Sequence, residues 1–162
     1  MIVSNSSPII VFGKQGRLEL LKECFGKVII PESVHQEILR KGESHEAAAV
    51  KKATNAKWLI VEKAEVSALL ITEKIGQGEK EAISLAVKHK IQLLIDDDFA
   101  KTYASILGVE AHGTLYIIYI SCFRDFITKN EAKGILNDMI EGSFYISTEL
   151  YSKFFDLLNS LK

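Results

Sequence analysis

Three consecutive aspartates, Asp96 to Asp98, follow the short apolar run from Ile91 to Ile95. A bounded apolar run of this length is typical of a buried parallel strand, and open α/β sheets bind ligands at the carboxyl ends of their strands. Glu79 and Glu81 stand shortly before this run, in the first turn of a predicted helix. A helix start and a strand end that are both acidic can together hold a divalent cation.

Two residues elsewhere can contribute to the same site. Asn5 directly follows a predicted first strand at Ile2–Val3, which puts it at the carboxyl edge of the sheet. It can equally do no more than satisfy the backbone of a turn. Glu37 lies beside the apolar stripe of a helix that starts at Pro31, and it either points inward or is a solvated surface residue.

The donor types select the metal. Carboxylate and amide oxygens without a Cys/His pair favour a hard cation, Mg²⁺ or Mn²⁺. Acting on a phosphodiester, such ions activate water and stabilise the charge on the leaving oxygen. The sequence has no EF-hand spacing, phosphate-binding glycine loop or nucleophile elbow. Asp98 alone has a simpler explanation, because it can cap a helix that begins at Phe99.

Composition excludes some functions. The chain has 162 residues, of which 48% are hydrophobic and 25% charged, which is ordinary for one globular domain with its own core. The formal net charge is −1, so the protein does not have the strongly basic surface that a passive nucleic-acid binder usually has.

We find no signal peptide and no apolar run of membrane-spanning length, so we expect a soluble, cytoplasmic protein. Cys24 and Cys122 are expected to be buried and reduced.

Short apolar strands alternate with helical segments along the chain. This alternation predicts a three-layer α/β/α sandwich with a mainly parallel central sheet, followed by C-terminal helices. We expect strands near residues 2–3, 27–30, 58–61, 91–95 and 109–111, with helices between them, one of them over 66–75.

The motifs named above resemble those of the PIN-domain family of metal-dependent ribonucleases over nearly the whole chain. VSNSSPII, PESVHQEIL and GQGEKEAISLAVKHKIQLLIDDD resemble the acidic segments of the family. The closest likeness is to a poorly characterised branch with a GE-x-EAI-x-LA pattern, a GTL segment at 113–115 and a C-terminal helical extension that includes SFYIS. The resemblance implies a PIN-like domain over 1–125 and a packed helical extension over 126–162.

The resemblance also implies residue roles. The catalytic carboxylates would be Glu37, Glu79 and Asp97, and the ligands of Mg²⁺ or Mn²⁺ would be Asn5, Glu37, Glu79, Asp96 and Asp97. An aspartate usually stands at the position of Asn5. The asparagine still offers a carbonyl oxygen, but it contributes no negative charge.

Many relatives of this kind are toxins of toxin–antitoxin modules. The resemblance therefore implies an endoribonuclease with an RNA substrate, a homodimeric state and a small antitoxin protein as partner. The alternative is a PIN-like protein of weak or absent catalysis that acts by binding RNA or protein.

Overall fold

The computed structural model describes residues 1–162. By its internal packing the chain forms two compact units, Met1–Thr114 and Leu115–Lys162. The division into 1–125 and 126–162 stays a prediction.

The first unit is built on a sheet of five parallel strands in the order β3-β2-β1-β4-β5. The strands are β1 (Ile2–Ser4), β2 (Val28–Pro31), β3 (Leu59–Glu62), β4 (Leu93–Leu94) and β5 (Ala111–His112). This architecture confirms the predicted α/β fold with a parallel sheet. The strands are short, and those at the centre (β1, β2 and β4) are buried along their whole length, as expected for strands covered on both faces.

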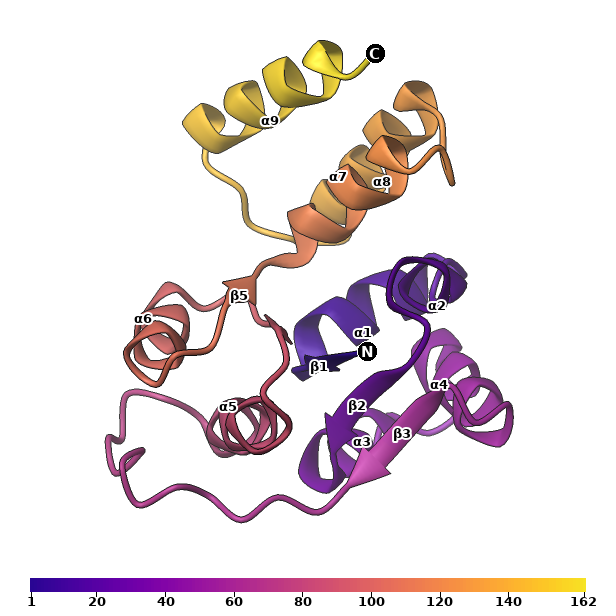
Figure 1. Cartoon of the computed structure of the whole chain (residues 1–162). Coiled ribbons are helices and arrows are strands. Elements are labelled where there is room, and N and C mark those ends of the chain that lie inside the picture. Colours follow the sequence, from indigo (N-terminus) through magenta and orange to yellow (C-terminus); the bar gives the residue numbers. More distant parts are fainter. The chain divides into compact units, whose positions relative to one another are not determined.

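Six helices connect these strands. They are α1 (Ser6–Lys14), α2 (Glu19–Phe25), α3 (Glu32–Leu39), α4 (His45–Asn55), α5 (Gln77–His89) and α6 (Asp98–Ile106). Helices α1, α3 and α4 contact one another, whereas α5 contacts α6 and the strands β1, β2 and β4. In Figure 1, α5 and α6 lie on the opposite side of β2 from α4.

Successive strands are added first on one side of the central strand β1 and then on its other side. From β1 it proceeds through β2 to β3, and it then crosses back so that β4 lies on the other side of β1. The order of strands thus reverses between β1 and β4, which are paired with Ser4 opposite Leu94. In open α/β sheets, ligands bind at this switch point, outside the carboxyl ends of the strands.

Helix α5 is held against the sheet by its apolar stripe. Ala82, Ile83, Leu85 and Ala86 are buried together with Val3 of β1 and Leu93 of β4. Complete burial of an aliphatic side chain stabilises a fold by about 1.5–3 kcal/mol, so this stripe fixes the rotation of α5 about its axis. That rotation decides where the acidic first turn of α5 points.

The segment from Val66 to Ile75 is not a helix, and that prediction was wrong. It is an irregular connection between β3 and α5, held by the buried side chains of Leu70 and Ile75. Its backbone bonds to nearby hydroxyls instead of forming a helical ladder. The Ser67 backbone N donates to Ser84 Oγ at 3.1 Å, and the Leu69 backbone N donates to Ser67 Oγ at 3.3 Å. Such local hydroxyl bonds compete with helix formation.

The second unit contains three helices, α7 (Thr114–Phe123), α8 (Lys129–Glu141) and α9 (Thr148–Ser160). Helix α8 begins with a capping box in which the Thr128 and Glu131 side chains bond the opposite backbone N–H groups. Buried side chains of α8 and α9 include Ile135, Leu136 and Leu158. None of the helices in the chain has the length and apolar character needed to cross a membrane.

Candidate active site

Asn5 and Asp96 lie on the two sides of the switch point. Asn5 follows β1 and Asp96 follows shortly after β4, and the two strands are neighbours in the sheet. The backbone N–H of Asn5 donates to the carbonyl oxygen of Leu94 at 2.9 Å, which extends the pairing of the strands to this edge. The sheet therefore brings an amide and a carboxylate side chain to its central carboxyl edge.

Asn5 combines both interpretations suggested by the sequence. Its Oδ1 accepts a hydrogen bond from the backbone N of Ser6 at 2.7 Å, so it caps α1. The residue is only 6% exposed and stands at the sheet edge. Its side chain is thus fixed by the start of α1, with one lone pair of Oδ1 already used.

Glu81 is a further candidate site residue, which the sequence analysis did not include among the catalytic or metal-binding residues. Its Oε2 accepts a hydrogen bond from Ser33 Oγ at the start of α3, and its Oε1 accepts one from Gln77 Nε2 at 2.8 Å. A Cβ placed on Gly78 would lie 3.9 Å from the same Ser33 Oγ and 3.8 Å from Asn5 Oδ1. Helix α5 thus places the Glu81 carboxylate against the start of α3, and the nearby Gly78 of α5 faces both α3 and Asn5.

The signal for Glu81 was present in the sequence. Glu79 and Glu81 stand in the same helical turn, and both occur in the GE-x-EAI pattern. Only the packing of α3 against α5 distinguishes them, because Ser33 lies on α3.

Glu79 is occupied by its own helix. Its Oε2 accepts a hydrogen bond from the backbone N of Gly76, the N-cap residue of α5, at 2.9 Å. The side chain is half-buried. Its role as a catalytic and metal-binding residue stays a prediction.

Asp96 is the carboxylate most firmly held at the edge. Both of its oxygens bond to Thr114, with Oδ1 accepting from the backbone N and Oδ2 accepting from Oγ1, each at 2.6 Å. Gly113 permits this approach, because a Cβ there would lie 2.9 Å from Asp96 Oδ1. Thr114 is fully buried, so the carboxylate is fixed by the segment that follows β5.

The next two aspartates stand at the start of α6. Asp97, not Asp98, caps α6, since Asp97 Oδ1 accepts from the Ala100 backbone N at 2.7 Å. Asp98 is the first helical residue, so the expectation that it caps a helix starting at Phe99 was wrong by one position. Asp97 is exposed and keeps its second oxygen, so its catalytic role stays a prediction.

Glu37 is exposed on α3. It lies four residues after Ser33, and residues at this spacing share one face of a helix. Ser33 contacts Glu81, so the face of α3 that carries Glu37 is the face that meets α5. The predicted roles of Glu37 as a catalytic residue and as a metal ligand stay predictions.

The donor chemistry fits Mg²⁺ or Mn²⁺. Asn5, Glu81 and Asp96 offer oxygen atoms only, which is what hard cations require. No group of three or more His, Cys, Asp or Glu side chains forms a preassembled cage in residues 1–162. Such a cage is not needed, because Mg²⁺ usually keeps several waters and takes one or two carboxylates together with substrate phosphates.

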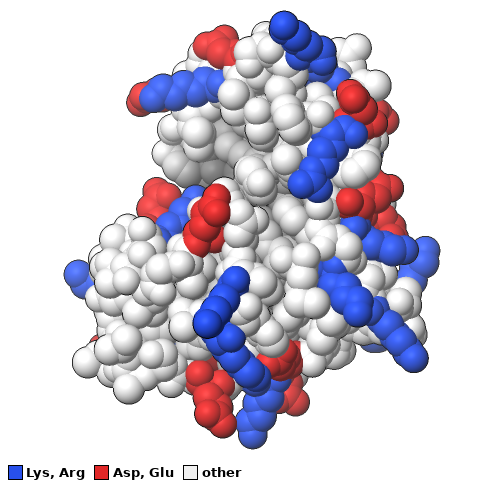
Figure 2. Space-filling view, in the orientation of Figure 1, with Lys and Arg blue, Asp and Glu red and all other residues white.

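Charges of both signs cover the visible surface. Figure 2 shows Lys and Arg interspersed with Asp and Glu, without a continuous basic face. Glu62 at the end of β3 is a carboxylate with a perturbed pKa. A hydrogen bond from Lys88 at 2.6 Å, and a further one with His89 at 2.8 Å, lower the pKa of Glu62 against the opposing effect of burial.

A doubly wound parallel sheet with an amide and a carboxylate at its switch point defines an α/β protein with oxygen donors where such folds bind their ligands. The chain belongs to the DUF3368 PIN domain family, whose model matches residues 1–160. Membership supports a nuclease-type function, and PIN domains are generally dependent on divalent metals.

The chain is also similar to a solved structure. It is a PilT N-terminus domain protein from the hyperthermophilic archaeon Sulfolobus solfataricus P2, at 17% identity and a TM-score of 0.49. The match covers 72% of this chain and 90% of that chain. A search of curated proteins gave no match.

Proposed function

We propose that this protein is a Mg²⁺- or Mn²⁺-dependent endoribonuclease that hydrolyses phosphodiester bonds in RNA. The observation that carries the proposal is the position of Asn5 and Asp96 after neighbouring strands, on the two sides of the switch point of a PIN-family sheet. Glu81 stands beside the same edge through Ser33. Oxygen-bearing side chains from three different segments thus lie at or beside this edge, and Mg²⁺ takes only one or two carboxylates together with waters and substrate phosphates.

The residues of the chain divide this work between them. Asn5, Glu81 and Asp96 would hold the cation, together with Glu37, Glu79 and Asp97 as the family resemblance implies. When bound, the cation supplies an activated water and stabilises the charge that develops on the leaving oxygen. Ser33 and Thr114 orient Glu81 and Asp96 through hydrogen bonds, as outer partners of metal ligands commonly do.

Cleavage of single-stranded RNA tests the proposal directly. The purified protein is incubated with a fluorescently labelled oligonucleotide in Mn²⁺, in Mg²⁺ and in EDTA. We expect internal cleavage with either metal and none in EDTA. Absence of cleavage in all three, with a protein shown to be folded, would contradict the enzymatic proposal.

Four variants then assign the carboxylates. We expect Asp96→Asn and Glu81→Gln to lose about 100-fold or more in rate, since each removes charge at the edge and keeps the shape. Glu79→Gln and Asp97→Asn should lose less, because each of these side chains already bonds its own helix start. Equal rates for wild type and Asp96→Asn would remove Asp96 from the site.

The alternative function is RNA or protein binding without appreciable catalysis. The neutral amide of Asn5, where relatives carry an aspartate, favours it, because the site then has one charge fewer to bind a cation. In that case the protein would bind the oligonucleotide in EDTA and in Mn²⁺ alike, without cleavage under either condition.

We further propose that the nuclease is a cytoplasmic toxin, homodimeric and inhibited by a small antitoxin protein. Support comes from the resemblance to toxin nucleases. Expression of the wild type in a bacterial host should arrest growth, whereas Asp96→Asn should not. Co-expression of the product of the neighbouring reading frame should restore growth, and light scattering should give the mass of a dimer.

A further inference from the structure

We propose that Lys101 binds a backbone phosphate of the RNA strand at the candidate active site, and that the strand continues along an open depression between α6 and β5. The inference rests on the proposed nuclease function and adds a substrate-binding residue and a path for the strand. It comes from the position of one ammonium group and from the surface beside it.

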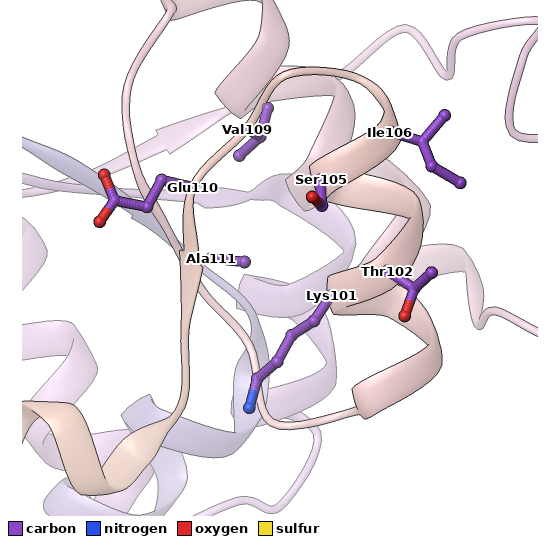
Figure 3. Close-up of a pocket in the computed structure, with 7 residues that line it drawn as sticks. All are labelled: Lys101, Thr102, Ser105, Ile106, Val109, Glu110 and Ala111. Carbon is purple, nitrogen blue, oxygen red and sulfur yellow. The ribbon is translucent and has the colours of Figure 1, made fainter.

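The Lys101 ammonium lies at the carboxyl edge of the sheet. A Cβ placed on Gly113 would be 3.2 Å from Lys101 Nζ and 2.9 Å from Asp96 Oδ1. The ammonium group of Lys101 and the carboxylate of Asp96 therefore both lie close to Gly113. In Figure 3 the Lys101 side chain leaves α6 in a different direction from Ile106.

Lys101 has donors left for a ligand. The Asp96 oxygens are occupied by Thr114, and the ion pair of Lys101 is made to Asp98 Oδ1 at 3.7 Å. The Asp98 side chain is 99% exposed, and an exposed pair of this kind contributes only about 0–1 kcal/mol. An ammonium group has three donors, so Lys101 can turn toward a phosphate at little cost.

The proposed site needs a positively charged side chain to bind the phosphate. A phosphodiester is an anion, and the edge already carries the carboxylates of Glu81, Asp96 and Asp97. A fixed positive charge beside Asp96 offsets their repulsion and holds the phosphate in register with the reacting bond. This local charge matters more in a protein whose net charge is −1 and whose visible surface mixes both signs.

A depression of about 500 Å³ lies between α6 and the segment that leads into β5, and Lys101 is one of the residues that line it. This volume lies within the usual range for ligand sites, about 300–1,000 Å³. Its wall consists of side chains from α6 and from the segment leading into β5: Lys101, Thr102, Ser105, Ile106, Val109, Glu110 and Ala111 (Figure 3).

The lining suits a nucleoside better than a second phosphate. Strand β5 is the outermost strand of the sheet, so one side of it has no strand neighbour. The hydroxyls of Thr102 and Ser105 are neutral partners for a sugar or a base. Glu110 accepts from Gln92 Nε2 at 2.9 Å, lies 3.1 Å from His112 Nε2, and points away from α6 in Figure 3.

Binding of a labelled single-stranded RNA oligonucleotide tests the proposal. Fluorescence anisotropy is measured in the Asp96→Asn background over a series of salt concentrations. We expect Lys101→Met to weaken binding about tenfold and to reduce the salt slope by about 0.7, the value for one phosphate contact on a single strand. Lys101→Arg should restore most of the affinity.

Two matched controls separate this role from general charge. Lys22→Met removes a lysine with a similar pair, to Glu19 at 3.8 Å, on α2 before β2 begins. Ser105→Glu adds a negative charge to the depression, and Ser152→Glu adds the same charge on α9. Only Lys101→Met and Ser105→Glu should weaken binding.

The outcomes distinguish the two proposals. Affinities and salt slopes that are the same for Lys101→Met and Lys22→Met would overturn the role of Lys101, whatever the wild type cleaves. A wild type that neither cleaves nor binds the oligonucleotide would overturn the nuclease proposal, and the role of Lys101 with it.

Discussion

Both carboxylate oxygens of Asp96 accept hydrogen bonds from Thr114, one from its backbone N and one from its Oγ1, each at 2.6 Å. The two residues stand after adjacent strands, β4 and β5, at the carboxyl edge of the sheet. Charge-assisted bonds of this length are stronger than those between neutral groups. The pair therefore fixes the orientation of the carboxylate on which the proposed site depends.

The first prediction concerns Thr114. Replacement by valine keeps the shape but removes the Oγ1 donor, so the partly buried Asp96 carboxylate loses one partner. We expect Thr114→Val to lower the free energy of unfolding by about 1–3 kcal/mol and to reduce RNA cleavage. Urea denaturation and the cleavage assay measure these two effects.

The control for this change is Thr102→Val. Its Oγ1 donates at 3.0 Å to the carbonyl of Asp98 on an exposed helix surface. We expect a change of less than about 0.5 kcal/mol there. If both threonine variants were equally stable, the bond to Asp96 would not contribute as argued.

The second prediction concerns Gly113. A Cβ in Gly113→Ala would lie 2.9 Å from Asp96 Oδ1 and 3.2 Å from Lys101 Nζ, so the carboxylate or the backbone must shift. We expect cleavage to fall by about tenfold or more, since small displacements of reacting groups cost large factors in rate. Initial rates at saturating Mn²⁺ measure the effect.

Gly134→Ala is the matched control. No atom lies within 4 Å of the added Cβ, and the position is inside α8. There the alanine should stabilise the protein by about 0.5–1 kcal/mol without affecting cleavage. An active Gly113→Ala variant with wild-type rates would show that Asp96 need not stay in its observed position.

The third prediction concerns Asn5. Aspartate caps a helix about as well as asparagine, so Asn5→Asp should retain the bond to the Ser6 backbone N. The added charge should tighten Mn²⁺ binding by roughly tenfold, which corresponds to about 1.4 kcal/mol. Isothermal titration calorimetry measures the affinity.

Stability without metal should change in the opposite direction. The added carboxylate would then be repelled by its acidic neighbours, so the melting temperature in EDTA should fall. A variant with weaker Mn²⁺ binding than the wild type would contradict the assignment of Asn5 as a ligand.

The fourth prediction concerns pH and Glu62. Hydrogen bonds from Lys88 and with His89 lower its pKa below the ordinary value of 4.5 in the folded state. A carboxyl group with a lowered pKa stabilises the fold fully above its unfolded pKa, and this contribution is lost as the pH falls through the folded pKa. Stability should therefore decrease from about pH 5 downward.

Glu62→Gln isolates this contribution. The difference in unfolding free energy between wild type and Glu62→Gln should be constant near neutral pH and should shrink below about pH 4.5. Denaturation curves at a series of pH values measure it. A difference that stays constant down to pH 3 would mean that Glu62 has the same pKa in both states.

The sequence alone determined the fold and the edge of the sheet at which two of the candidate residues lie. Short apolar runs such as Ile2–Val3 and Leu93–Leu94, separated by helical segments, specify a parallel sheet covered on both faces. Polar residues directly after such runs must lie at the carboxyl edge, because all strands of a parallel sheet point the same way. This reasoning placed Asn5 and Asp96 correctly at that edge.

The tertiary structure decided which individual side chains meet there. Glu79 and Glu81 stand two residues apart at the start of one helix, and only the family resemblance pointed to Glu79. In the fold, Glu79 bonds to Gly76 and Glu81 reaches Ser33 on α3. Periodicity describes one helix against a core, but it contains no information about a second helix that packs across its first turn.

The same limit applies to the aspartates and to the segment before α5. Which of Asp96 to Asp98 turns inward depends on Thr114, which is 18 residues away in the sequence. Residues 66–75 have the composition of a helix, but Ser84 Oγ and the burial of Leu70 fix them as an irregular connection. In each case a partner distant in the sequence outweighs a local preference, because a buried polar group or apolar side chain contributes more free energy than intrinsic propensity does.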